Sequence, residues 1–316
     1  MIINTERSHL KYWYGEDRTQ IWRKDNLETT SMSVGGCIRK PMSLKAELIR
    51  NARMISKSYP DLTLFMSGGL DSEMALQSFL TAGIVPRIVT VRFPNGKNMH
   101  DIGPAMRMFE HMGLKYEILD IDPDEFVMSG EAFEIGARFQ SYSFYQQLLM
   151  KLTLEYNAPM ITIDEIELEK LPSINWETGE HHDRWCFLKK EDQDGVWRRF
   201  ADATGIPALN NFYSYSPESI LAFLQLPTVD DLINDRIPGK LGWTSSKMKI
   251  YSHLGYNFRK RPKWHGVENY MHLWDYVRYN VYEKSNLNFD ERSYVMPIDQ
   301  LKQNLINGVE TVCNIA

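Results

Sequence analysis

Residues 67–72, which read SGGLDS, carry the clearest chemical signal in the sequence. They follow a mostly apolar run, residues 61–66 (DLTLFM), and precede a segment of helical character, residues 73–82. Two adjacent glycines let the backbone turn at little steric cost and approach a ligand closely. Successive amide N–H groups then line a concave loop, and the next helix points its positive dipole end at the same place. The segment therefore predicts a phosphate site, with its serines as hydroxyl donors and its aspartate as an oxygen ligand for magnesium.

A structural interpretation of the same six residues stays open. A strand, a glycine turn and a helix can form a tight and well-capped connection that binds nothing. In that case Asp71 would serve only the N-terminus of the helix.

The elements around this loop predict an α/β domain. Apolar residues at helical spacing predict a helix over residues 44–58, and Pro60 blocks its continuation. Strands and helices then alternate, as in a parallel sheet. The further strands are expected at residues 61–66, 88–93, 116–121 and 159–163, and the further helices at 73–82, 101–112 and 137–156.

Outside this domain the sequence does not predict alternating strands and helices. Residues 1–42 lack periodicity, and we interpret them as an irregular N-terminal extension. Beyond residue 170 no run predicts a strand, whereas residues 196–204 and 217–225 predict helices. We therefore expect an α/β domain that carries the predicted phosphate site over residues 43–170 and a mainly helical substrate or lid region over residues 171–316.

Composition and charge narrow the class of protein. The chain has 316 residues, 43% of them hydrophobic, and a formal net charge of −5, so no global charge favours nucleic acid or a membrane surface. No apolar run reaches the length of about 18 residues that a membrane span needs. Residues 1–11 are polar, unlike a signal peptide. The three cysteines are isolated, which favours a reducing cytoplasmic setting over disulfides or zinc.

SGGLDS resembles the SGGxDS signature of the PP-loop ATP pyrophosphatases, also called the adenine nucleotide alpha-hydrolase-like superfamily. The pattern is closest to the synthetase domain of asparagine synthetases. There a strand that meets adenine precedes a DxxxA helix start, and residues 89–93 (VTVRF) and 101–105 (DIGPA) match these two features. The resemblance covers about residues 61–122. It implies an α/β fold with a HUP-type, Rossmann-like parallel sheet.

The resemblance also implies a ligand set and a reaction. ATP and Mg²⁺ would bind at the carboxyl ends of the strands, and attack on the α-phosphate would release pyrophosphate and leave an adenylate. Asp71 would take part in catalysis and bind the metal. Adenine would lie near Met66 and Val91. The pyrophosphate would be held by Ser67, Gly68, Gly69, Leu70, Asp71 and Ser72.

Other candidates lie farther along the chain. Asp164 and Glu165 follow the last predicted strand, where a second magnesium ligand is needed, but the GxGADE glycines of asparagine synthetases are missing. These acids are either metal ligands or solvated and capping groups. Lys247 and Lys263 lie in the only dense basic clusters and are either phosphate-binding cations or part of a solvated face. Residues 181–183 (HHD) lack a partner at ligand spacing and are interpreted as a surface loop.

Absent features select a branch of the family. Position 2 is Ile2, so no N-terminal cysteine is expected for glutamine hydrolysis, and paired or clustered cysteines for sulfur transfer or zinc are missing. The expectation is an amide- or amidine-forming ligase acting on a small carboxylate or carbonyl compound, with free ammonia or a separate glutaminase as nitrogen source. Two alternatives stay open: a tRNA- or nucleobase-modifying enzyme, and a non-catalytic nucleotide-binding protein that keeps the fold.

Overall fold

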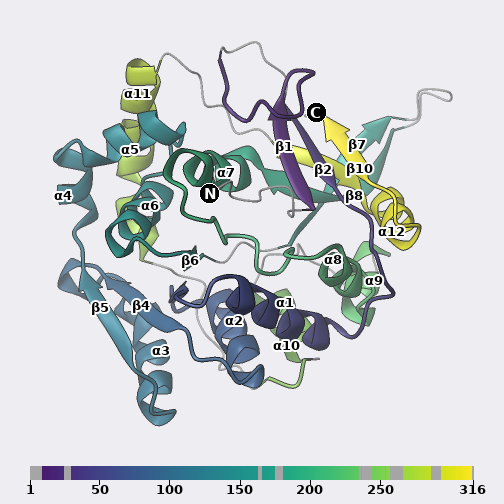
Figure 1. Cartoon of the computed structure of the whole chain (residues 1–316), viewed down its shortest axis with the longest axis horizontal. Helices are drawn as coiled ribbons and strands as arrows, with labels where there is room; N and C mark the ends of the chain where they lie inside the picture. Colours follow the sequence, from purple (N-terminus) through teal and green to yellow (C-terminus); the bar gives the residue numbers. More distant parts are fainter. Residues whose placement is uncertain are drawn as a thin grey trace.

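The computed structural model gives the path of most of the chain (Figure 1). The described residues are 9–24, 30–162, 166–174, 181–234, 236, 244–252, 254–256, 266–285 and 293–314.

A four-stranded parallel sheet lies at the centre of the predicted α/β domain. Its strands are β3 (Thr63–Phe65), β4 (Arg87–Arg92), β5 (Tyr116–Asp120) and β6 (Met160–Ile161), in the spatial order β5-β4-β3-β6. Successive strands run outward from β3 to β5, and the chain then returns to place β6 on the other side of β3. The strand order therefore reverses beside β3, and ligands of open α/β sheets bind at such points. The expected α/β fold class is confirmed.

Helices cover both faces of this sheet. One face carries α1 (Leu44–Ser58), α2 (Leu70–Thr81) and α3 (Met99–His111). Alternate residues of a strand point to opposite faces, so Leu64 of β3 packs in the larger hydrophobic cluster and Phe65 in the smaller one. These three helices and the four strands lie within a few residues of the positions predicted from the sequence.

The helix predicted over residues 137–156 is two helices, and the single-helix prediction is wrong. After α4 (Pro123–Met128), the chain forms α5 (Glu131–Phe139) and α6 (Phe144–Tyr156). Gln140 between them has a φ of 55°, in the left-handed region. The side chain of Gln140 accepts from the backbone N–H of Arg23 and donates to its carbonyl, while the guanidinium of Arg199 donates to the carbonyls of Phe139 and Gln140. Distant residues thus satisfy the backbone where α5 ends.

Two antiparallel sheets contradict the expectation of an irregular N-terminus and of no strands beyond residue 170. The first has the order β1-β2-β10, with β1 (Leu10–Tyr14), β2 (Thr30–Val34) and β10 (Thr311–Asn314). The second has the order β7-β8-β9, with β7 (Glu167–Ile174), β8 (His181–Lys190) and β9 (Ser293–Pro297). The central strand β2 reads TSMSV and is buried at every position, so it shows neither an apolar run nor alternation.

Helices beyond residue 170 follow the sequence more closely. The helices predicted at residues 196–204 and 217–225 are α7 (Glu191–Thr204) and α8 (Pro217–Leu224). The region also contains α9 (Pro227–Ile233), α10 (Thr244–Ser252), the 3₁₀ turn η3 (Val267–Tyr270), α11 (His272–Ser285) and α12 (Ile298–Ile306). None of the helices in the described ranges is long and apolar enough to cross a membrane.

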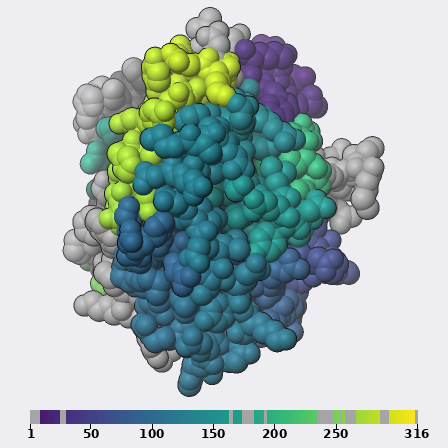
Figure 2. All heavy atoms as spheres, turned by 90° about the vertical axis from the view of Figure 1, so that its left-hand side faces the viewer, coloured from purple at the N-terminus to yellow at the C-terminus, as the bar shows by residue number. Residues whose placement is uncertain are grey.

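Late helices pack directly on the sheet domain. In Figure 1 α2 lies beside α1 and α10, and it contacts both. Figure 2 shows α11, in yellow-green, against the teal residues of the helices that follow β5, and α11 contacts α4, α5 and α6. The larger hydrophobic cluster joins side chains from all three predicted segments. The segment boundaries at residues 42 and 170 stay a prediction.

The contact between α5 and α11 yields a test of packing. A Cβ added to Gly136 would lie 2.5 Å from both Gln147 Nε2 and Val281 Cγ2, so Gly136→Ala should lower the free energy of unfolding by about 1–3 kcal/mol. Gly103 in α3 is the control, because its added Cβ meets atoms no closer than 3.6 Å. Gly103→Ala should be neutral or stabilising by up to about 1 kcal/mol. Denaturant unfolding measures both, and equal effects would contradict the packing described here.

Candidate functional site

The loop of residues 67–72 joins the carboxyl end of β3 to the start of α2. Beyond the strand, the Met66 N–H donates to the carbonyl of Val89 at 2.8 Å, and Thr90 Oγ1 donates to the Met66 carbonyl at 2.7 Å. These bonds tie the loop to β4. Gly69 is the N-cap residue of α2, and no side chain there accepts from the helix amides. The first amides of α2 therefore lie next to the loop without a local cap.

Gly68 has a requirement that only glycine meets. Its φ is 88°, in the left-handed region, and an added Cβ would lie 2.5 Å from the carbonyl oxygen of Asp101. The start of α3 thus touches the loop backbone itself. This contact explains why the glycine of the sequence motif has this position.

The two serines of the loop bond within it. Ser67 Oγ accepts from the Gly69 N–H at 3.2 Å and lies 3.2 Å from Ser72 Oγ, which donates to the Gly69 carbonyl at 3.0 Å. Ser67, Gly69 and Asp71 are only partly buried, while Ser72 is buried. The loop is therefore held in shape from inside and remains accessible at alternate residues.

Asp71 is the meeting point of three elements. One carboxylate oxygen accepts from Lys247 Nζ at 2.7 Å, and the other accepts from the hydroxyl of Tyr251. Both donors belong to α10. From the loop before α8, the Tyr213 hydroxyl donates to the Asp71 backbone carbonyl at 3.1 Å. The carboxylate of Asp71 is thus bonded to α10, whereas the structural interpretation of the sequence assigned it to the N-terminus of α2.

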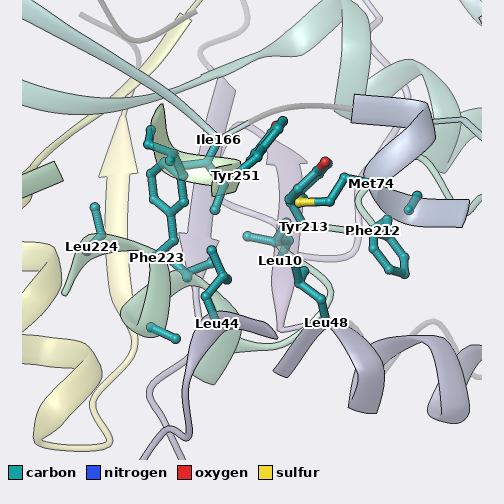
Figure 3. Close-up of a cluster of buried hydrophobic side chains, with 14 of the residues drawn as sticks. Leu10, Leu44, Leu48, Met74, Ile166, Phe212, Tyr213, Phe223, Leu224 and Tyr251 are labelled. Atoms are coloured by element: carbon teal, nitrogen blue, oxygen red, sulfur yellow. The ribbon is translucent and has the colours of Figure 1, made fainter. Parts of the chain in front are cut away.

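The sequence predicts Lys247 as a site residue but does not predict the two tyrosines. The rings of Tyr213 and Tyr251 stack at 6.2 Å with an interplanar angle of 10°, and Figure 3 shows both in the cluster that contains Met74 of α2. The one sequence signal is that residues 247 and 251 are four apart and so share a helix face. Burial raises the pKa of the Tyr251 phenol well above its usual value, and the charge of Asp71 raises it further. The neutral phenol can therefore only donate to that carboxylate.

A cavity of about 290 Å³ opens beside the loop, at the carboxyl ends of β3 and β4. Its walls are mainly apolar, with a few polar groups. The lining residues are Phe65, Ser67, Val91, Phe93, Asn98, Asp101, Tyr145 and Val267. Val91, expected near adenine, thus lines the cavity. Met66, expected there too, is fully buried in the larger hydrophobic cluster, and its position near a base stays a prediction.

The polar residues of the cavity have defined surroundings. Asn98 closes the end of β4, because its Nδ2 donates to the Val91 carbonyl at 2.8 Å and its Oδ1 accepts from the Phe93 N–H at 2.9 Å. Asp101 is 4% exposed. Burial raises the pKa of the Tyr145 phenol, and the nearby charge of Asp101 adds to this effect. The cavity thus combines a mainly apolar space with amide, carboxylate and hydroxyl groups.

Several predicted residues are not placed in the site. Asp164, Glu165 and Lys263 lie outside the described residues. The HHD sequence at residues 181–183 begins strand β8, so its interpretation as a loop is wrong. Within the described ranges no three His, Cys, Asp or Glu side chains form a group that could hold a metal ion by themselves.

Comparison with known proteins gives weak likenesses. No family model and no curated protein matches the chain. Three solved structures are similar at TM-scores near 0.3, too low to carry an argument about activity. An ammonia-dependent NAD synthetase from Campylobacter jejuni has a TM-score of 0.29 and 18% identity, over 38% of this chain and 54% of that one. The match thus spans about half the length of that protein.

Two more of the similar solved structures are matched over almost their whole length. An NMN synthetase from Francisella tularensis has a TM-score of 0.30 and 15% identity, over 70% of this chain and 97% of that one. A predicted tRNA methyltransferase subunit from Methanocaldococcus jannaschii has a TM-score of 0.31 and 12% identity, over 65% and 94%.

The close approach at Gly68 can be separated from its backbone conformation. Gly83 has a similar φ of 79° but no atom within 4 Å of an added Cβ. Gly83→Ala should therefore cost only the left-handed strain, about 1–2 kcal/mol of unfolding free energy. Gly68→Ala should cost about 1–3 kcal/mol more, because the new methyl group meets the Asp101 carbonyl. Equilibrium unfolding of both variants checks this, and equal losses would refute the contact.

Proposed function

We propose that this chain is a PP-loop ATP pyrophosphatase-type ligase, which adenylates an acceptor and lets a nitrogen nucleophile displace AMP. One observation carries the proposal. The SGGLDS loop lies at the reversal of strand order, with Lys247 bonded to its aspartate and an apolar cavity beside it. This juxtaposition provides places for a polyphosphate, a counter-charge and a flat base.

The loop suits the outer phosphates of a nucleotide. The uncapped N-terminus of α2 offers amide donors and the positive end of the helix dipole. Gly68 allows the left-handed turn and the close contact with the Asp101 carbonyl that give the loop its shape. The accessible hydroxyl of Ser67 adds a donor at the edge of the cavity.

Magnesium fits the donors present. Mg²⁺ is usually held by one or two carboxylates together with substrate phosphates, so it does not need a cluster of protein ligands. The Asp71 carboxylate, partly exposed beside the loop, is the oxygen donor that this mode requires. When bound, the ion would neutralise charge on the departing pyrophosphate. Asp164 and Glu165 stay candidate second ligands.

Lys247 supplies the second positive charge. Its side chain is 16% exposed, and its Nζ lies 2.7 Å from a carboxylate oxygen of Asp71, so the ammonium is held beside the loop. A charge fixed in advance stabilises a developing anion without having to reorganise during the reaction. We assign Lys247, with Asp71, to catalysis, and Lys263 stays a further candidate.

The cavity suits adenine. A base can lie between Val91 and the aromatic walls formed by Phe65 and Tyr145. A volume of about 290 Å³ is at the lower end for ligand sites, which fits a base rather than a whole nucleotide. The phosphates would then extend past Ser67 to the loop.

The chemistry has two balanced steps. A carboxylate or carbonyl oxygen of the acceptor attacks the α-phosphorus, and the bond to the β-phosphate oxygen breaks to release pyrophosphate. A nitrogen lone pair then attacks the activated carbon, AMP leaves with the bonding electrons of the carbon–oxygen bond, and the nitrogen loses a proton. The enzyme's part is positioning and charge neutralisation. We propose a small-molecule acceptor, with ammonia or a separate glutaminase as nitrogen source.

Product analysis tests the reaction. With α-³²P-ATP, Mg²⁺, ammonia and pooled metabolites or tRNA, labelled AMP and unlabelled pyrophosphate should form together. Asp71→Asn should slow this at least about a hundredfold, because it removes the metal-binding charge. Asp61→Asn is the control, since Asp61 is exposed before β3 and outside the loop. Formation of ADP and phosphate would contradict the mechanism, and a product only with tRNA would favour the tRNA-modifying alternative.

Filling the cavity tests the base site. Val267 lines the cavity from η3 and is only partly buried, so Val267→Trp should occupy the space and weaken ATP binding at least about tenfold. Val85→Trp adds the same ring at a position that is 65% exposed and should bind as wild type. Isothermal titration calorimetry measures both affinities. Unchanged binding by the Val267 variant would place the base elsewhere.

A further inference from the structure

Asp71 is bonded more extensively than a metal ligand at a loop edge requires. Each of its carboxylate oxygens accepts a hydrogen bond from α10, one from Lys247 and one from Tyr251. The main-chain carbonyl of the same residue accepts from Tyr213. The residue is thus fixed at both its side chain and its backbone.

Packing holds the ring of Tyr251 in place. Its side chain is 4% exposed, and its ring is parallel to that of Tyr213. Tyr213 in turn packs edge-on against Phe212, which lies against Phe79 of α2. The phenol therefore reaches Asp71 from a ring that packing holds in place, whereas Lys247 reaches it on a long flexible chain.

The bonding leaves room for a metal. An ionised carboxylate has about four acceptor positions, two on each oxygen. Lys247 and Tyr251 take one on each oxygen, so a cation can still be bound while both contacts persist. Without the phenol, the ammonium of Lys247 alone would set the direction of the carboxylate.

We propose that Tyr251, whose ring stacks on Tyr213, is a positioning residue for Asp71. Its hydroxyl holds the Asp71 carboxylate in the orientation in which that carboxylate binds the Mg²⁺ of a metal-bound nucleotide. This inference rests on the proposed function. Lys247 and Tyr251 then have different roles at the same carboxylate. Lys247 supplies a positive charge, and Tyr251 fixes the orientation of the Asp71 carboxylate.

The expected signature is a loss that depends on the metal. Tyr251→Phe removes one oxygen atom and keeps the stacked ring. Because a hydrogen bond to a charged group is lost, the Kd of the magnesium complex of α,β-methylene-ATP should rise about tenfold. The Kd of the same nucleotide in EDTA should change less than about twofold, since no ion then uses Asp71.

Two further variants complete the measurement by isothermal titration calorimetry. Tyr213→Phe removes the hydroxyl that bonds the Asp71 backbone and should give a smaller loss with the same metal dependence. Tyr142→Phe is the control, because Tyr142 is a buried tyrosine of the other hydrophobic cluster, and it should bind as wild type in both conditions. Thermal unfolding of each variant verifies folding, and Tyr213→Phe decides the question if Tyr251→Phe does not fold.

The outcomes are distinguishable. An equal loss with and without Mg²⁺ would show that Tyr251 only maintains the fold, and no loss in either condition would show that it does not act on Asp71; each overturns the inference and leaves the proposed function standing. A wild-type protein that binds neither form of the nucleotide overturns the proposed function, and the inference with it.

Discussion

The structure of the site depends on the contact between the backbone of Gly68 and the carbonyl of Asp101. No side chain fits between them, so the backbone of the loop after β3 packs directly against the backbone of the first turn of α3. That contact also brings the polar start of α3 beside the loop, and the side chains of Asn98 and Asp101 line the cavity there. One steric constraint thus fixes both the loop and the wall of the neighbouring space.

A second link connects the sheet domain to the late part of the chain. Asp71 lies in the first turn of α2, and its carboxylate is bonded to α10, more than 170 residues later. The sheet domain therefore supplies the loop and most of the cavity wall, while the late part of the chain supplies Lys247 and Val267. Neither part holds the complete set of groups.

The sequence predicts local features well and distant pairings poorly. The buried strands read as apolar runs, and glycines mark the helix ends, so the parallel sheet and the loop are predictable from residues close together. Strand β2 is different, because its Thr and Ser positions are buried only through pairing with β1 and β10 from the two ends of the chain. The break at Gln140 is of the same kind, since Arg23 and Arg199 create it from far away.

In the site, too, the local features are predictable from the sequence and the distant contacts are not. Residues 67–72 are recognisable because two glycines and three polar side chains occupy consecutive positions. Tyr213 and Tyr251 are not, because nothing in the sequence separates them from the aromatic residues of the core, and both rings do lie in the core. Only the hydroxyls face the loop. Lys247 is predictable from its basic cluster together with the family resemblance, which implies a cation near the phosphates.

Stability alone does not explain the Lys247–Asp71 pair, and the proposed function gives the pair a role. A largely buried ion pair contributes little compared with apolar side chains of the same volume, because both charges lose their hydration. In the proposed function, a polyphosphate adds an anion beside Lys247 and its metal ion adds a cation beside Asp71, so both charges stay paired. A site assembled in this way keeps its charges placed and paired before the ligand is present, and the stacked tyrosines keep the carboxylate from following the lysine.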